Sequence, residues 1–343
     1  MTIHDTPHVL PQMKAHFTEL DGIRGILSLV ILLFHLGLNP LIEKSSFGVI
    51  TDGRYELAVD FFFILSGFVL CYVSRSRKPA PVRFLVSRAF RMLPVSTVSL
   101  ILCLVATRTT GDASTFVANL LLLQLFLGLP HLNRVAWSAC SEMWMPAFLG
   151  YGAWLGQEIK RPMLWTLLIV VGVLDGLALS NAFAFNRFLI DIIRSFAGLS
   201  AGFLFCMLYR PVLQAPSGEK PGATIKLMLF SAALIMVLGG IFPHLVFAFP
   251  FVAGFAIVGL LHVKSFLSGS ACQFFGARSY SLYMVHWPVL LFFNAHFGAE
   301  AMKGNIPLKG AIILLSILLA DLTHRFVETP CLRLREKLLR GRA

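Results

Sequence analysis

Apolar segments follow one another along almost the whole chain, with only short polar stretches between them. Each is close to the length of about 20 residues that an α-helix needs to cross a bilayer. Flanking proline, glycine and charged residues separate eleven such segments: 22–42, 57–74, 92–108, 114–130, 141–157, 163–181, 188–209, 226–243, 245–263, 280–297 and 307–327. The sequence therefore predicts an all-α fold, a polytopic integral membrane helical bundle.

The composition supports this fold class. Hydrophobic residues make up 57% of the 343 residues and charged residues only 13%, whereas a soluble domain has about 25% charged residues. No polar stretch is long enough for a separate soluble domain. We expect an N-terminal segment at 1–19, a membrane domain at 20–332 and a basic tail at 333–343.

The basic stretches predict the orientation, because Lys and Arg of short loops stay on the cytoplasmic side. Residues 75–91 contain six cations and no acid, and the tail is also basic. Both termini are then cytoplasmic, which requires an even number of crossings. If 114–130 is left out of the count of crossings, the milder basic loops also lie on the cytoplasmic side. We therefore expect about ten transmembrane helices plus one re-entrant or interfacial piece at 114–130.

Several classes of protein are disfavoured. The polar start and the Arg24 charge do not match a signal peptide, so the first span should stay. The six cysteines are scattered singly, which implies neither a disulfide framework nor a metal site. The net charge of +12 is explained by orientation and anionic lipid headgroups. We expect no nucleic acid binding and no bound cofactor.

Arg24 and His35 are the first candidate functional residues, eleven positions apart in the first span. Eleven steps of a helix bring both side chains to nearly one face, about 16 Å apart along the axis. Ionisable residues inside a spanning helix are costly and indicate a functional site facing protein or water. Alternatively, Arg24 extends to the headgroups and His35 joins a neighbouring helix.

The next two spans carry further polar candidates. Asp60 is either an interfacial carboxylate or a substrate contact, and Ser66 with Gly67 either allows close helix approach or contributes to a site. Arg88 and Arg91 are spaced i, i+3 and project from one side of a helix. They either set the orientation or bind phosphate through charge-assisted hydrogen bonds.

The remaining candidates lie in later segments. Glu142, between two tryptophans, is a candidate catalytic residue that can exchange protons or orient a sugar hydroxyl. His286 lies three residues from Tyr283, a pair that is often structural. Glu328 and Pro330 are expected to end the last span, where Glu328 can pair with a nearby arginine.

These residues together resemble membrane-bound acyltransferase family 3, also called the O-antigen and polysaccharide O-acetyltransferase type. The likeness covers the chain from Leu20 to Arg335. The motifs that carry it occur in order: LDGIRG with Arg24-x10-His35, VDFFFILSGF, the R-x-x-R of Arg88 and Arg91, the WS…E that ends at Glu142, SYSLYMVHWP, and the E-x-P of Glu328 and Pro330.

The resemblance implies that residues 20–332 form a transmembrane acyltransferase domain. Its donor would be cytoplasmic acetyl-CoA or another acyl-CoA, and its acceptor a hydroxyl of a carbohydrate or lipid-linked glycan at or beyond the outer face. By analogy, His35 is the catalytic base or carries the acyl group itself. Arg24, Arg88 and Arg91 would bind the CoA phosphates, with Glu328 supporting the site.

The same resemblance implies a multi-pass protein of the bacterial cytoplasmic (inner) membrane that modifies polysaccharide. Some relatives carry an additional extracytoplasmic SGNH-type hydrolase domain, and this sequence ends eight residues after Arg335. We expect it to complete the reaction alone, to pass the acyl group to a separate extracytoplasmic partner, or to acylate a small or lipid-linked acceptor.

Two other functions fit the same residues. A transporter or channel can use intramembrane Arg, His and Glu as a proton or substrate pathway, but its ionisable groups are expected near the midplane of the bilayer. A non-catalytic assembly subunit would be affected by loss of His35 only in its stability. An acyltransferase with a small non-glycan acceptor is a third alternative.

Overall fold

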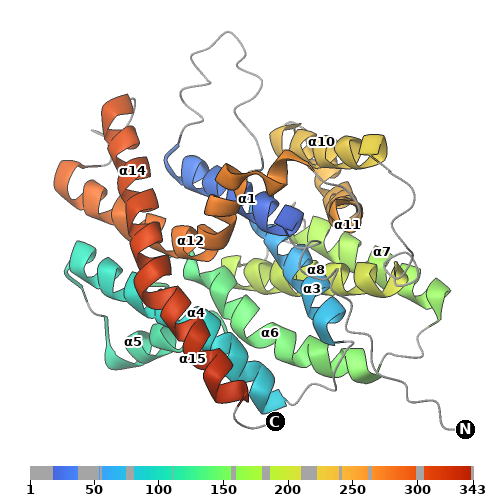
Figure 1. Ribbon diagram of the computed structural model, residues 1–343, viewed down its shortest axis with the longest axis horizontal. Helices are drawn as coiled ribbons and strands as arrows, with labels where there is room; N and C mark the ends of the chain where they lie inside the picture. The colour runs from blue at the N-terminus through green and yellow to red at the C-terminus, as the bar shows by residue number, and fades with distance from the viewer. Residues whose placement is uncertain are drawn as a thin grey trace, which may run out of the picture.

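The regular secondary structure that the computed structural model describes is entirely helical, and no strand occurs among the described residues (Figure 1). The described residues are 18–37, 54, 56–74, 81–109, 111–155, 160–179, 186–209, 222–238, 242–261, 265–298 and 305–340. Most of the expected N-terminal segment and part of the basic stretch 75–91 lie outside them.

The elements are named in chain order. The α-helices are α1 Thr18–His35, α3 Leu57–Ser74, α4 Pro81–Thr107, α5 Ala113–Leu120, α6 Ala136–Leu155, α7 Arg161–Leu179, α8 Arg187–Leu208, α10 Gly222–Leu238, α11 Phe249–Leu260, α12 Ser270–Phe297, α14 Ile306–Thr323 and α15 Thr329–Arg340. Two short 3-10 helices are η2 Pro243–Ala248 and η3 Phe266–Ser268, and η4 His324–Glu328 is a π-helix.

Every predicted apolar segment overlaps a helix, which confirms the all-α membrane fold. Within the described ranges, four helical stretches are able to cross a membrane by length and composition: Val82–Thr107, Arg161–Ala178, Arg187–Leu208 and Ile306–Leu339. Shorter apolar helices cover Leu57–Tyr72, Leu227–Met236 and His244–Leu260. The count of ten crossings stays a prediction.

Segment 114–130 contains only the short helix α5, whose eight residues span about 12 Å and cannot cross a core of about 30 Å. The Asp112 side chain caps its first turn by accepting from Thr115 N. After α5 the chain turns back, and the buried Asn119 side chain binds Pro130 O and Leu132 N at 2.9 and 3.0 Å. This segment therefore contains no helix long enough to span the bilayer, and its re-entrant or interfacial position stays a prediction.

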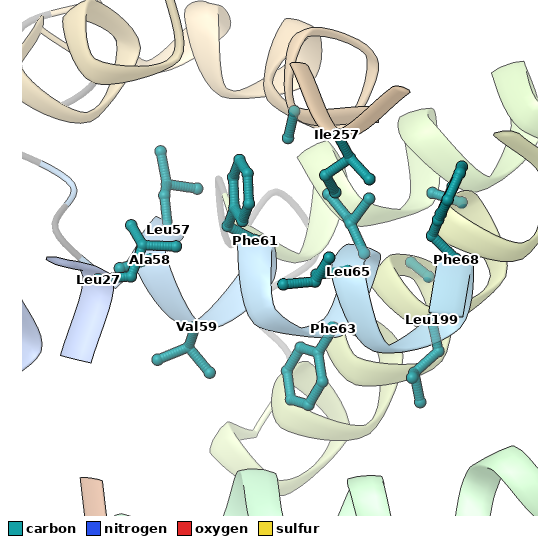
Figure 2. Packing of buried hydrophobic residues seen from close by; sticks show 14 of the residues in the cluster. Leu27, Leu57, Ala58, Val59, Phe61, Phe63, Leu65, Phe68, Leu199 and Ile257 are labelled. Atoms are coloured by element: carbon teal, nitrogen blue, oxygen red, sulfur yellow. The ribbon is translucent and has the colours of Figure 1, made fainter. Parts of the chain in front are cut away.

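Helix α3 lies in the middle of the hydrophobic core (Figure 2). Phe63 is buried on the side of this helix opposite to Phe61 and Phe68, which are buried as well, and this is the pattern of a helix surrounded by protein (Figure 2). A Cβ atom on Gly67 would clash with the Leu199 carbonyl of α8. Gly67 therefore allows α3 and α8 to approach closely, as one of the two interpretations of this motif predicts.

Helix α12 packs against α1, α4 and α14. Pro288 lies inside it and has no N–H to bond the Met284 carbonyl one turn earlier. Instead, Ser99 Oγ and Asn133 Nδ2 donate to this carbonyl at 2.6 and 3.1 Å. The middle of α12 is thereby fixed to α4 and to the loop before α6.

The helix does not end at Glu328 and Pro330, and the expectation that they end the last membrane span stays a prediction. Pro330 cannot donate to the carbonyl four residues earlier, but the chain widens into the π-helix η4, where Thr329 N bonds His324 O. The helix then continues as α15 along α4 (Figure 1). The stretch from Ile306 to Leu339 has 34 residues, which makes it about 51 Å long.

Candidate active site

A cavity of about 310 Å³ opens between α1, α3, α4, α6, α12 and α15. Its wall contains four arginines: Arg24 of α1, Arg88 and Arg91 of α4, and Arg335 of α15. The structure thus brings together the three arginines that the sequence analysis assigns to phosphate binding. Among the described residues, Glu142 is the single carboxylate that lines the same cavity.

The arginines are held in different ways. Arg24 Nη1 lies 2.8 Å from Asp21 Oδ1, one turn earlier on α1. Arg88 Nε donates to the backbone oxygen of Glu142 at 2.7 Å, which connects α4 to α6. Arg91 is exposed and has no hydrogen bond or ion pair with the described residues. The cavity therefore has an excess of positive charge, suited to an anionic ligand.

Glu142 is joined to Ser66, whose hydroxyl donates to Glu142 Oε1 at 2.6 Å. Both residues line the cavity, so Ser66 contributes to the site while Gly67 serves helix packing. Because α6 begins at Ala136 rather than 141, Glu142 lies well inside the helix and not at its start. A carboxylate beside a serine hydroxyl in a cavity can accept, hold or release a proton.

His35 and His286 contact each other at the other end of α1. The two rings are 5.1 Å apart between centroids, and His286 Nε2 lies 3.1 Å from His35 Nδ1. The Trp287 ring lies edge-on to His35 at 5.3 Å. Gly37 follows His35 by two residues, and its carbonyl oxygen accepts from the buried Lys309 side chain of α14 at 3.1 Å. Lys309 thereby caps the end of α1.

His35 does not line the cavity. The two are linked by Tyr283, which lines the cavity and whose ring lies 5.9 Å from the His286 ring. The Tyr283 hydroxyl accepts from Ser138 at 2.8 Å and donates to Val135 O at 3.0 Å. The line of contacts therefore runs from the arginine cavity through Tyr283 and His286 to His35.

Asp60 lies outside the cavity lining, in a buried ion pair between α3 and α8. Both Asp60 oxygens accept from Arg194, at 3.1 and 2.7 Å, and Trp137 stacks against the Arg194 guanidinium at 5.4 Å. The fully buried Asp175 of α7 has no hydrogen-bond partner among the described residues. Asp60 therefore joins helices here, and its role as a substrate contact stays a prediction.

Glu328 is also buried outside the cavity lining. It accepts from Ser281 Oγ of α12 at 2.7 Å, and His324 Nδ1 lies 3.1 Å from the same carboxylate oxygen. This contact holds the π-helix against α12, next to the cavity residue Tyr280. A direct contact between Glu328 and acyl-CoA stays a prediction.

Sequence reasoning did not find Arg335 or Arg194. Arg335 belongs to a run of charges that was attributed to membrane orientation, and only the continuation of the helix through Pro330 brings it to the cavity. Arg194 is the single cation within 188–209, and a buried charge of this kind indicates a partner. That signal was available in the sequence.

The acyltransferase-domain family model matches residues 17–325. A protein described as a membrane-bound transacylase, BcsY of Komagataeibacter xylinus, is 25% identical over 354 residues, 89% of this chain and 82% of the relative. The O-acetyltransferase OatA of Staphylococcus aureus (strain NCTC 8325) is 25% identical over 362 residues, 91% of this chain. The chain spans only 56% of the length of OatA.

No solved structure matches this chain. The family match covers the cavity arginines of α1 and α4, Glu142 and the histidine pair, whereas Glu328 and Arg335 follow its last residue. The family match and the apolar helices together identify an integral membrane protein with the acyltransferase fold. The chain belongs to the membrane-bound acyltransferase 3 family.

Proposed function

We propose that this protein transfers an acyl group, most simply acetyl, from acyl-CoA to a hydroxyl of a carbohydrate acceptor. The observation that carries this proposal is the cavity lined by Arg24, Arg88, Arg91 and Arg335. CoA has a pyrophosphate and a 3′-phosphate, and arginine binds phosphate through paired, charge-assisted hydrogen bonds. Neutral donors would not require four cations.

The cytoplasm is the proposed source of the donor. The cavity lies where α1 begins and where α4 and α15 present their basic ends, and basic residues favour the cytoplasmic side. The phosphates would stay with the arginines while the pantetheine arm extends along α12 toward Tyr283. His35, at the far end of α1, would then meet the acceptor from the opposite side of the bacterial inner membrane.

His35 is the proposed general base. Its Nε2 atom takes the proton from the acceptor hydroxyl while the hydroxyl oxygen bonds to the thioester carbonyl carbon. The carbon–sulfur bond then breaks, its electron pair leaves with the CoA sulfur, and His35 returns the proton to that sulfur. The products are the O-acylated acceptor and CoA with a free thiol.

Acyl transfer from labelled acetyl-CoA tests the proposal. Membranes with the wild type, His35→Gln or His296→Gln are compared at equal expression, because His296 is an exposed histidine of α12 outside the site. We expect His35→Gln to lower turnover by roughly 10²- to 10⁴-fold, the usual contribution of a general base. Equal turnover of all three proteins would refute the role of His35.

Binding of the donor is measured separately. Arg88→Ala and Arg91→Ala are expected to weaken acetyl-CoA binding more than acceptor binding. If labelled acetyl-CoA does not bind to the wild type, the donor assignment is wrong. The transporter alternative would then be favoured if a labelled solute crossed vesicles that contain the protein.

A further inference from the structure

The positions of the hydrogen atoms in the His35–His286 pair follow from their neighbours. His286 Nδ1 lies 3.2 Å from the Leu282 carbonyl oxygen, which can only accept, so Nδ1 carries the hydrogen. A neutral imidazole has one N–H, which leaves His286 Nε2 as an acceptor. The hydrogen in the 3.1 Å contact between the rings therefore belongs to His35 Nδ1.

We propose that His286 is a positioning residue, which holds His35 in the tautomer with hydrogen on Nδ1 and a free lone pair on Nε2. This inference rests on the proposed function of His35 as the base. In a Ser-His-Asp triad, the third group fixes the tautomer and the ring orientation of the histidine. Here a neutral histidine takes that role.

A neutral pair fits the surroundings better than a charged one. His286 is 1% exposed, and no carboxylate contacts either ring among the described residues. Two charged side chains contact the neighbours of the pair, and both are cations: Arg134 stacks on Trp287 at 5.7 Å, and Lys309 donates to Gly37 O at the end of α1. An imidazolium buried here would lack compensation, which is costly.

Helix α12 holds His286 rigidly. Met284, two residues earlier, has its carbonyl bonded by Ser99 and Asn133, and Asn133 Nδ2 also lies 2.5 Å from Ser99 Oγ. The hydroxyl of Tyr283 is bonded on both its donor and its acceptor side. His286 is thus fixed by contacts that do not involve His35, as a positioning residue requires.

Helix α1 brings the other ring to the same place. A Cβ atom on Gly25 would clash with the backbone of α12 at Gly276, so the two helices approach closely. Lys309 caps the last turn of α1, where His35 is the final helical residue. His35, at the end of α1, and His286, inside α12, are therefore each held in place by contacts outside the pair.

Nitrogen NMR of the full chain in nanodiscs, labelled with ¹⁵N-histidine, reads the tautomer directly. The signals of His35 are identified by their loss in His35→Gln. We expect an N–H at Nδ1 and an unprotonated Nε2 at neutral pH in the wild type. A hydrogen on Nε2 of His35 would overturn the inference whatever the variants do.

The variants test the role of His286. His286→Leu is expected to shift His35 toward the other tautomer and to lower kcat roughly 10- to 100-fold, less than the loss of about 10⁴-fold when a charged triad partner is removed. The KM for acetyl-CoA should stay within about twofold, since the donor site is intact. His286→Gln can accept through its amide oxygen and should restore the tautomer and most of kcat.

The matched control is His296→Leu, on the same helix and with the same contact to a carbonyl one turn earlier, at 2.8 Å. It should match the wild type. If His35→Gln retains activity, the proposed function fails. If His35→Gln is inactive but His286→Leu keeps the wild-type kcat or the wild-type tautomer of His35, the positioning role alone is refuted.

Discussion

Arg24 and His35 lie on the same helix but belong to different parts of the site. Arg24 lines the arginine cavity, whereas His35 contacts His286 beyond Tyr283. The spacing of eleven residues thus places one cation in the proposed donor cavity and one imidazole at the proposed point of transfer, about 16 Å away.

Arg335 should bind a phosphate of the donor. We expect Arg335→Gln to raise the KM for acetyl-CoA roughly tenfold, since a hydrogen bond to a charged group contributes about 1.5–3 kcal/mol. Arg333 lies two residues before Arg335 on α15 and does not line the cavity. Arg333→Gln removes the same charge, so the KM of this variant for acetyl-CoA should change little. Steady-state kinetics in detergent check this.

Dephospho-acetyl-CoA, which lacks the 3′-phosphate, shows which phosphate Arg335 contacts. If the contact is to the 3′-phosphate, the wild type prefers acetyl-CoA and Arg335→Gln loses that preference. An unchanged preference assigns Arg335 to the pyrophosphate. Equal KM values for Arg335→Gln and Arg333→Gln would contradict any phosphate contact.

Tyr283 should limit the passage of water between the cavity and the histidine pair. Tyr283→Ala is expected to increase acetyl-CoA hydrolysis without acceptor, because water then reaches the thioester. Tyr283→Phe keeps the ring and loses two hydrogen bonds. Hydrolysis of acetyl-CoA by Tyr283→Phe should stay low. Release of the CoA thiol in the absence of acceptor measures the hydrolysis rate of both variants. Equal hydrolysis by the wild type and Tyr283→Ala would argue against this role.

Glu142 should act through its charge and proton exchange. Glu142→Gln keeps the shape and can still accept from Ser66, but we expect kcat to fall roughly 10²-fold or more. Ser66→Ala removes only the 2.6 Å hydrogen bond and should cost about 1 kcal/mol, or roughly fivefold. The opposite order of the two effects would assign Glu142 to structure rather than catalysis.

The Asp60–Arg194 pair should contribute to stability. Its side chains are 0% and 3% exposed, so Arg194→Met leaves a buried carboxylate and is expected to cost about 3–5 kcal/mol of unfolding free energy. Arg187 on the same helix pairs with Asp191 while 71% exposed, and Arg187→Met should cost less than about 1 kcal/mol. Thermal unfolding in detergent compares them. Similar losses in both variants would contradict the assignment.

The sequence predicted the helices well because apolar residues mark the membrane part of each one. Helix α3 begins and ends where the apolar segment 57–74 does. Helices α4, α6 and α12 begin earlier than predicted because they continue into polar residues, as Pro81 and Ser270 at their starts illustrate. Hydropathy reports the apolar environment, and backbone hydrogen bonds determine where a helix ends.

The site was predicted in part. Arg24, Arg88 and Arg91 come together as predicted, but Ser66 and Glu142 line the same cavity, which the sequence analysis did not predict. The His35–His286 contact joins residues 251 positions apart, and no local pattern encodes such a distance. Arg335 was missed because a proline that normally stops a helix is here accommodated by a π-helix.

The continuous helix from α14 to α15 touches both parts of the site. Near its start Lys309 binds the end of α1 beside His35, and near its finish Arg335 lines the cavity. These residues are 26 positions apart, or about 39 Å along one axis. One continuous helix therefore contributes an arginine to the proposed donor cavity and the lysine that caps α1 beside the proposed base, with the π-helix η4 between the two.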